Sequence, residues 1–192
     1  MTRITLIDGH PDPAPERFVH ALADAYARSA EEAGHQVRRL DLAKIDFPFL
    51  RTARDWQDGA PGTAIKRAQD DVRWADHVVI VYPLWLGDVP ALLKAFLEQV
   101  ARPGFAIGQT DRRIPAKLLK GRSARIIVTM GMPGLFYRVV FRAHSLKSLE
   151  RNILRFVGFG PVRHSIIGNV ESGRRHRQKW LRRIAKLGAA AR

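Results

Sequence analysis

The sequence predicts one α/β domain that spans residues 1–192 and is built on a five-stranded parallel sheet. Short β-branched runs alternate along the chain with longer stretches whose apolar residues recur at helical spacing. Such alternation implies parallel strands joined by right-handed crossovers, with helices on both faces of the sheet. The 192 residues suffice to bury a substantial core, and no linker, repeat or low-complexity tract divides them.

Five apolar runs are expected to form the strands. The run over residues 77–82 is the most apolar, which suits the centre of a parallel sheet that is covered on both faces. Five strands alternating with five helices suit a flavodoxin-like, three-layer α/β/α sandwich with strand order 2-1-3-4-5. The five runs are 4–7, 37–42, 77–82, 125–129 and 162–167.

Five further segments are expected to be helical. Gly34 suits the end of the first helix, and Pro90 suits the first turn of the third. The final helix is strongly basic and carries an apolar stripe that includes Trp180 and Ile184. The helical segments are 16–33, 63–74, 90–100, 145–157 and 174–188, whereas 45–61 and 102–122 are interpreted as long loops.

The charge is distributed unevenly along the chain. The whole sequence carries 33 basic and 18 acidic residues, which gives +15. Residues 101–192 contain 21 basic and three acidic residues, a net charge of +18, against −3 for residues 1–100. This imbalance suggests an anionic partner, such as a phosphate-bearing cofactor, a nucleic acid, an anionic membrane or an acidic protein, or else a solvated basic surface.

Several classes of protein are excluded or disfavoured. The absence of cysteine excludes disulfide frameworks, thiolate metal ligands and cysteine nucleophiles. The seven histidines form neither an HxxxH nor an HExxH pair, so no metal is expected. The chain also lacks a GxGxxG fingerprint, a Walker A loop and a GxSxG elbow. No apolar run is long enough for a membrane span and no signal peptide is recognisable, so a cytoplasmic location is expected.

Ligands of such sheets bind beyond the carboxyl ends of the strands, which directs attention to three loops. The first covers residues 9–17 and leads into a helix whose free N–H groups favour an anion. Arg17 either adds a forked cation suited to phosphate or is a solvated side chain, and His10 is either a ring donor or a turn residue without a ligand. Glu16 is unfavourable there, because its negative charge repels a phosphate.

The second and third loops have the composition of a site for a planar ring. Residues 83–90 offer an apolar shelf next to Gly87, with expected free peptide N–H groups; the same residues would also suit a core-covering turn or an oligomer contact. Residues 129–137 contribute a hydroxyl, two glycines and Tyr137, which is either a hydrogen-bond donor or a packing residue. His144 either lies near the same pocket or caps the following helix.

Taken together and in order, these loops resemble the flavodoxin-like NAD(P)H:quinone oxidoreductase family, which includes DT-diaphorase and its bacterial relatives. Residues 75–94 are similar to the family's segment WAD-(apolar)-PLxWxxxPAxLK. Residues 128–132 resemble its VTTGG, Gly9-His10-Pro11 resembles its GHP, and residues 102–106 resemble the stretch after the PLxW helix. The resemblance extends over roughly residues 3–170.

The resemblance implies a tightly bound flavin, FAD or FMN. In this family NAD(P)H reduces the flavin through hydride transfer to N5, then leaves, and a quinone or similar electrophile takes its place, so the kinetics are ping-pong. The family is commonly homodimeric, with its pocket at the subunit boundary. Exposed aromatic residues such as Trp85, Phe136 and Phe141 would suit that contact.

The resemblance also implies roles for individual residues. His10, Arg17 and Phe18 would line the flavin phosphate. Tyr137 stands where the family has its active-site tyrosine, and His144 is one residue out of step with the family's histidine. One side of the isoalloxazine ring would be held by Pro83, Leu84, Trp85 and Leu86, and the other side by Thr129, Met130, Gly131 and Met132. Glu16 replaces the usual hydroxyl, and Met132 replaces the second glycine.

Two other functions remain as alternatives. Some bacterial relatives are ancillary subunits of potassium-efflux systems, and the basic half would suit docking on an acidic or membrane-bound partner. Nonspecific nucleic-acid binding would require only the basic surface. No recognition module is present and aromatic residues are not interleaved with the basic ones, so specific nucleic-acid binding is not expected.

Overall fold

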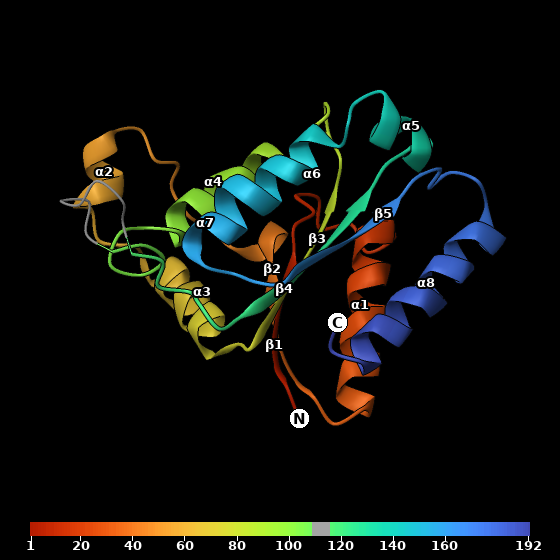
Figure 1. Ribbon diagram of the computed structural model, residues 1–192, viewed down its shortest axis with the longest axis horizontal. Helices are drawn as coiled ribbons and strands as arrows, with labels where there is room; N and C mark the ends of the chain where they lie inside the picture. Colours follow the sequence, from red (N-terminus) through yellow and green to blue (C-terminus); the bar gives the residue numbers. More distant parts are fainter. Residues whose placement is uncertain (109–115) are drawn as a thin grey trace.

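The computed structural model describes residues 1–108 and 116–192 and contains one five-stranded parallel sheet (Figure 1). The strand order is β2-β1-β3-β4-β5, which confirms the predicted 2-1-3-4-5 topology. All pairings are parallel, and β3 lies between β1 and β4. The strands are β1 (Arg3–Asp8), β2 (Gln36–Asp41), β3 (His77–Pro83), β4 (Ser123–Thr129) and β5 (Val162–Ile167).

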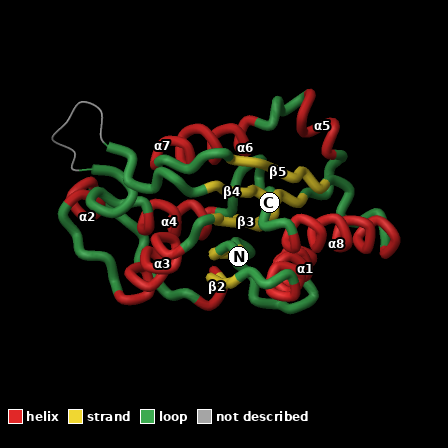
Figure 2. The backbone as a smooth tube through the Cα atoms, turned by 60° about the horizontal axis from the view of Figure 1, so that its bottom comes forward, coloured by secondary structure: helices red, strands yellow, loops and turns green. Residues whose placement is uncertain are grey.

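The helices form two layers that enclose the sheet (Figures 1 and 2). One layer consists of α1 (Phe18–Glu32) and the basic α8 (Arg174–Ala189). The other layer consists of α3 (Thr63–Trp74), α4 (Ala91–Val100) and the segment formed by α6 (His144–Ser148), a π-helical turn η2 (Leu149–Leu154) and α7 (Arg155–Val157). The three-layer sandwich that the alternation predicts is therefore confirmed.

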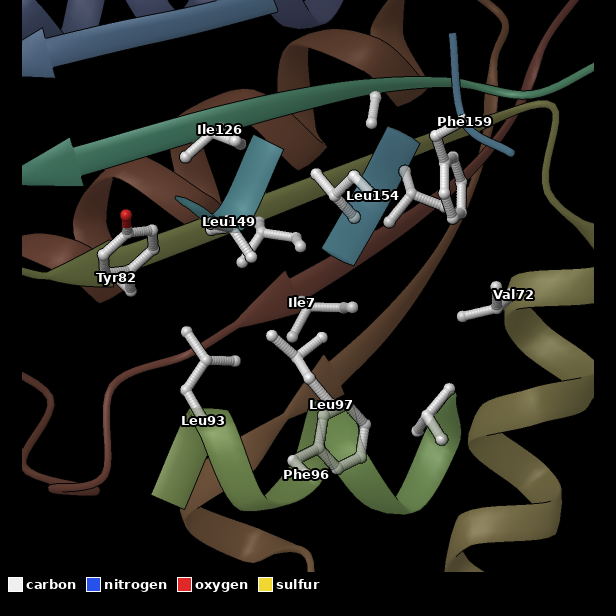
Figure 3. Close-up of a cluster of buried hydrophobic side chains, with 14 of the residues drawn as sticks. Ile7, Val72, Tyr82, Leu93, Phe96, Leu97, Ile126, Leu149, Leu154 and Phe159 are labelled. Carbon is white, nitrogen blue, oxygen red and sulfur yellow. The ribbon is translucent and has the colours of Figure 1, made fainter. Parts of the chain in front are cut away.

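Strand β3 contributes to both cores because its side chains alternate between the two faces of the sheet. Every residue of β3 is buried. Val79 and Val81 pack in the cluster with α1 and α8, whereas Ile80 and Tyr82 pack in the cluster with α4. Figure 3 shows Leu93 of α4 on the Tyr82 side of this second cluster. The fully apolar run at 77–82 is thus explained by burial on two faces.

Two short elements between β2 and α3 were not expected from the sequence. A 3₁₀ turn, η1 (Leu42–Lys44), follows β2 and takes up Leu42, the last residue of the expected strand 37–42, and α2 (Ala53–Gln57) lies within the expected loop 45–61. Helix α2 begins with a reciprocal capping box between Thr52 and Asp55. No residue of α2 is buried, so its five residues present no apolar periodicity by which it could be predicted.

Buried polar groups fasten this segment to α4. The Arg102 guanidinium donates to the carbonyl oxygens of Asp55 and Gly59 at 2.5 and 2.6 Å and to the Gln99 side chain at 2.5 Å. The Gln99 amide donates in turn to the Pro48 carbonyl. Of the predicted loop 102–122, residues 109–115 lie outside the described residues.

The region after β4 also differs from the expectation. Helix α5 (Gly134–Val139) forms inside the stretch that was expected to be a loop up to residue 137. The expected helix over 145–157 is confirmed as one unbroken helical run from His144 to Val157, in which α6 and α7 flank the π-helical turn η2. Two left-handed residues, Arg142 and Ala143, separate α5 from α6. Within residues 1–108 and 116–192, we find no helix with the length and apolarity needed to cross a bilayer.

Candidate cofactor site

The structure brings the three candidate loops together at the carboxyl edge of the sheet. The Gly9 N–H donates to the Val81 carbonyl at 2.7 Å, and the Leu84 N–H donates to the Thr129 carbonyl at 2.7 Å. The loop after β1 is therefore bonded to β3, and the loop after β3 is bonded to β4. Because every strand is parallel, all three loops emerge at the same edge.

The loop after β1 is held by a series of short-range hydrogen bonds. The Asp8 carboxylate accepts the His10 N–H at 3.3 Å, and the Nδ1 of His10 accepts the Asp12 N–H at 3.0 Å. The Asp12 carboxylate then accepts the Ala14 N–H at 2.9 Å. Gly9 is required here, because a Cβ atom would lie 2.9 Å from Leu93 and 3.0 Å from a main-chain oxygen of β3.

His10 links the first loop to the second. Its buried imidazole lies between the rings of His20 and Trp85, at centroid distances of 5.3 and 5.5 Å. The contact with Trp85 is edge-to-face, with an interplanar angle of 83°. Burial, followed by the repulsion of His20 and Arg17, lowers the pKa of His10, which favours the neutral ring near pH 7.

Arg17 and Phe18 lie at the start of α1, as predicted. The Arg17 guanidinium is paired with the Asp12 carboxylate at 2.6 Å, and both side chains are exposed. Phe18 is half-buried, with the Arg177 guanidinium 5.5 Å from its ring centroid. No side chain within the described residues caps the first turn of α1, so this turn has N–H groups free to meet an anion.

The loop after β3 is a tight turn with an apolar tip. Trp85 and Asp88 exchange main-chain hydrogen bonds of 3.0 and 2.9 Å, while Leu86 and Gly87 adopt left-handed conformations with φ of 46° and 81°. The N–H of Trp85 is used in this turn, and the N–H of Leu84 donates to the Thr129 carbonyl. The sequence predicted free peptide N–H groups in this loop, but these two are not free. The shelf is instead formed by the half-exposed Trp85 indole and the fully exposed Leu86.

The loop after β4 provides an open glycine. Thr129 and Met130 are buried, Met132 is half-buried, and the Met132 carbonyl accepts the Asn169 N–H at 3.1 Å. At Gly131 an added Cβ would meet no atom of the described residues within 4 Å, and the backbone has no positive φ. Neither packing nor backbone conformation therefore requires a glycine at this exposed position.

Tyr137 and His144, the two side chains considered as hydrogen-bond donors, differ in exposure: Tyr137 is buried and His144 is exposed. Tyr137 of α5 is buried, and its hydroxyl lies 2.7 Å from the Ser145 hydroxyl and accepts the Leu146 N–H at 3.1 Å. These contacts join α5 to α6 and direct the hydroxyl into the protein. His144 is exposed and is the first residue of α6.

The structure adds two polar residues to the site that were not singled out from the sequence. Asp8 ends β1 and is 1% exposed, and its carboxylate lies 2.6 Å from Nδ1 of His20 on α1. The Nε2 atom of His20 lies 2.9 Å from the Asp12 carbonyl oxygen. A charged residue at the end of an apolar strand was the sequence signal for Asp8, but the pairing depends on how α1 packs.

A small polar cavity adjoins this pair. Its volume is about 220 Å³, and Arg39 and Lys44 reach it from beyond β1. The full lining consists of Asp8, His10, Pro13, Pro15, His20, Asp24, Arg39, Asp41, Leu42, Ala43 and Lys44. In the described part of the chain, no group of three or more histidine or carboxylate side chains is arranged to hold a metal ion.

Comparison with known proteins confirms the flavodoxin-like fold. The family Flavodoxin_2, described as a flavodoxin-like fold, matches residues 2–188. The NAD(P)H:quinone oxidoreductase from Methanothermobacter marburgensis superposes with a TM-score of 0.82 at 22% identity, covering 100% of this chain and 99% of that one. At this identity the superposition supports the fold alone.

Two curated relatives are similar in sequence. A ribosyldihydronicotinamide dehydrogenase-like protein, traD, from Penicillium crustosum is 32% identical over 155 residues, which cover 67% of this chain and 57% of that protein. The chain thus spans less than two thirds of this relative. An FMN-dependent NADH:quinone oxidoreductase from Ruegeria pomeroyi is 28% identical over 154 residues, 69% of this chain and 72% of that protein. Since the family match covers nearly the whole sequence, this chain belongs to the Flavodoxin_2 family of flavodoxin-like proteins.

Proposed function

We propose that the protein is an FMN-dependent oxidoreductase that transfers hydride from NAD(P)H to a quinone or a similar electrophilic acceptor. Membership of the family and the activity for which the Ruegeria relative is named support this proposal. The observation that carries it for this chain is the open glycine, Gly131, which follows the buried Thr129 and Met130 at the carboxyl edge of the sheet.

The residues present fit a flavin. A glycine that the fold itself does not require is expected where a flat ligand approaches the main chain closely, and Gly131 is such a glycine. Trp85 and Leu86 offer apolar surface for one edge of the ring. The uncapped first turn of α1 offers N–H groups to a phosphate, although three prolines and Glu16 leave this loop with fewer donors than a hydroxyl-bearing loop would have.

The proposed contacts follow the order of the loops. Thr129, Met130, Gly131 and Met132 would lie along one side of the ring, and Pro83, Leu84, Trp85 and Leu86 along the other. Arg17 would exchange Asp12 for the phosphate, a change that costs little because the exposed ion pair is weak. His10 would approach the cofactor from the loop after β1. Tyr137 would support the site by joining α5 to α6, with His144 at the rim.

When bound, the flavin supplies the hydride-accepting and hydride-donating chemistry that links NAD(P)H to the acceptor. The protein contributes binding and orientation. The apolar shelf excludes water from one edge of the site, and the neutral His10 keeps a ring N–H for donation to an electronegative atom. One shelf serves both substrates, so they bind alternately and the kinetics are expected to be ping-pong.

We also propose a homodimer that works in the cytoplasm, where NAD(P)H is available. Large apolar side chains remain exposed near the site, among them Trp85 at 46% and Phe136 at 47%. Apolar hollows of about 420 and 460 Å³ along α4 share Lys94 and Ile153 and would be covered by a second copy. Sedimentation at micromolar concentration should give twice the chain mass of 21.7 kDa, and a monomer would contradict the dimer.

The test of the activity is direct. Purified protein should either carry a flavin absorption spectrum or quench added FMN fluorescence on binding. It should then oxidise NADH or NADPH at a rate that depends on both FMN and a water-soluble benzoquinone. Absence of FMN binding together with absence of FMN-dependent oxidation would refute the proposal.

A further inference from the structure

The imidazole of His20 faces a hydrogen-bond acceptor at each nitrogen. Its Nδ1 lies 2.6 Å from the Asp8 carboxylate, and its Nε2 lies 2.9 Å from the Asp12 carbonyl oxygen. A neutral imidazole has one N–H and can satisfy one of these acceptors. Both contacts are hydrogen bonds only when the ring carries two protons, that is, when His20 is an imidazolium.

The surrounding charges favour the same state. The carboxylate of Asp8 is 1% exposed and requires a nearby cation, because an unpaired buried charge is costly. Arg39 of β2 lies 3.6 Å from Asp8, but it also pairs with Asp24 of α1 and with Asp41. Lys44 pairs with Asp41 as well. His20 is therefore the closest cationic partner of Asp8 in the described part of the chain.

The same loop determines the tautomer of His10. Because the Asp12 N–H donates to Nδ1 of His10, that nitrogen carries no proton, and the neutral ring bears its proton on Nε2. Within residues 1–108 and 116–192 no hydrogen-bond partner lies at this Nε2. The His10 ring stands beside Trp85, at the rim of the proposed cofactor site.

The two histidines are coupled through Asp12. The carbonyl of Asp12 meets His20, and its N–H meets His10. A protonated His20 anchors Asp12 and Asp8 at once, and Asp8 also accepts the His10 N–H. Loss of the His20 proton removes one of the two anchors and frees the main chain that orients His10.

We propose that Asp8 and His20 act as a positioning pair, in which the His20 imidazolium holds the loop so that His10 presents its Nε2–H to the bound flavin. The identity of the ligand in this inference rests on the proposed flavin-dependent function. The protonation of His20 beside Asp8 does not depend on that function. It assigns to the loop after β1 a charged support that does not touch the cofactor.

The pair makes cofactor binding dependent on pH. Burial opposes the charged form of His20, but the hydrogen bonds to Asp8 and Asp12 and the charges of Asp8 and Asp41 outweigh it and raise the pKa of His20 above 6.5. The stabilisation of the loop by the His20 imidazolium is therefore complete below pH 6.5 and is lost as the pH rises through the pKa of His20 in the folded protein. The groups facing it are Asp8, His10, Asp12, Arg17, Asp24, Arg39, Asp41 and Lys44.

The first experiment uses the protein without flavin. Nitrogen-15 NMR of the histidine rings at pH 7 should show His20 protonated at both nitrogens and His10 protonated at Nε2 alone. Assignment uses the variants His20→Asn and His10→Asn. A neutral His20 at pH 7, or a His10 protonated at Nδ1, would overturn the proposal whether or not the protein binds flavin.

The second experiment measures FMN and riboflavin affinity by fluorescence quenching between pH 7 and pH 9. For the wild type, we expect the Kd for both ligands to rise about tenfold over this range, equal to about 1.4 kcal/mol. His20→Asn and Asp8→Asn should bind both ligands weakly at pH 7 and show no pH dependence. His35→Asn serves as the matched control, because His35 contacts Thr2 and Ala189 at the opposite end of β1, and its affinities should equal those of the wild type.

The outcomes separate the two proposals. If the wild type binds neither FMN nor riboflavin, the proposed function fails, and NMR still decides the state of the pair. If it binds both but His20→Asn retains the wild-type pH profile, the positioning role is refuted and the function stands. An effect confined to FMN would also refute the proposed contact, because His10 or the charge of His20 would then act on the phosphate and not on the part of the flavin that FMN and riboflavin share. A melting curve of each variant without ligand verifies that it is folded.

Discussion

Gly131 shows how a single residue can reveal a ligand that the protein must accommodate. Gly9 is small because Leu93 and β3 crowd it, and Gly87 is glycine because its φ is 81°. Gly131 has neither reason. Because Gly131 also lies at the carboxyl edge of the sheet, where ligands of such sheets bind, its smallness is informative about binding, and replacing it should separate stability from affinity.

Gly131→Ala should therefore change stability and cofactor affinity in opposite directions. We expect the free energy of unfolding without flavin to rise by about 0.4–1 kcal/mol, because alanine restricts the unfolded chain. FMN affinity should fall about tenfold, equal to about 1.4 kcal/mol, because the added methyl group occupies the ring site. Chemical denaturation and fluorescence titration measure the two quantities.

Gly62 provides the control for this substitution. It is equally open and also lacks a positive φ, but it lies at the start of α3. Gly62→Ala should leave FMN affinity unchanged. Unchanged affinity in Gly131→Ala, or an equal loss in Gly62→Ala, would remove Gly131 from the site.

His77 gives a second prediction for a single residue, concerning acid stability. It is 2% exposed at the start of β3, and burial, followed by repulsion from Arg125 and Arg163, lowers its pKa to about 4. The unfolded chain binds this proton below pH 6.5 and the folded chain does not, so stability falls as pH drops from about 6.5 to about 4. The 2.5-unit difference corresponds to about 3 kcal/mol.

The variant His77→Gln should lack this part of the acid dependence. Urea unfolding of the wild type and the variant at pH 7 and pH 4.5 tests this prediction. The titration of carboxylates affects both proteins equally, so it cancels in the comparison. The difference in unfolding free energy between wild type and variant should shrink on acidification. A pH-independent difference would show that His77 is not held neutral by burial.

At the scale of elements, α1 and α8 approach each other closely enough to demand a glycine. A Cβ on Gly188 would lie 2.2 Å from the Tyr26 carbonyl oxygen of α1. Tyr26 is completely buried beneath this contact, and its neighbour in the same cluster is Ile184 of α8. The crossing of the two helices therefore depends on Gly188 as well as on the apolar stripe.

Gly188→Ala should destabilise the protein even though alanine is the better helix former by about 1 kcal/mol. The methyl group must displace α8 from α1, and overpacking of this kind typically costs about 1–3 kcal/mol net. Thermal unfolding should show a lower Tm. The neighbouring exposed change Ala189→Gly should have a smaller effect, and a stabilised Gly188→Ala would show that the helices separate freely at this end.

At the scale of the whole molecule, binding at the carboxyl edge couples to global stability. A ligand that binds only the folded protein at one hundred times its Kd stabilises it by about 2.7 kcal/mol. For a chain of 192 residues this corresponds to a rise in Tm of about 5–10 °C. Differential scanning fluorimetry with FMN checks this, with adenosine monophosphate as the phosphate-bearing control. An equal shift with both would indicate adventitious phosphate binding at the basic surface.

The basic character of the molecule is concentrated in its second half, where residues 101–192 carry 21 basic and three acidic residues. This half includes α8, whose exposed face is lined with arginine. Such a field attracts phosphate-bearing molecules from solution over about one Debye length, roughly 8 Å at physiological salt. It therefore favours encounter with a dinucleotide without specifying where the dinucleotide binds.

The parallel sheet and the three loops at its carboxyl edge were predictable from the amino-acid sequence, and the strand order followed from the fold class that the alternation suits. The strands and loops were predictable because they depend on periodicity and on glycine and proline at their boundaries, both of which are local properties of the chain. The run at 77–82 and the loop residues 83–90 were informative for this reason. Short exposed elements such as α2 left no such pattern and escaped prediction.

The directions of the polar side chains of the site followed from the folded structure and not from the sequence pattern. Asp8 and His20 are 12 residues apart, and the 2.6 Å contact between them exists because α1 packs over the end of β1. The Tyr137 hydroxyl faces Ser145 rather than solvent because two left-handed residues, Arg142 and Ala143, turn α6 back against α5. Hydrogen bonds depend on angles and on tenths of an ångström, which the packing of distant elements sets and which local periodicity does not encode.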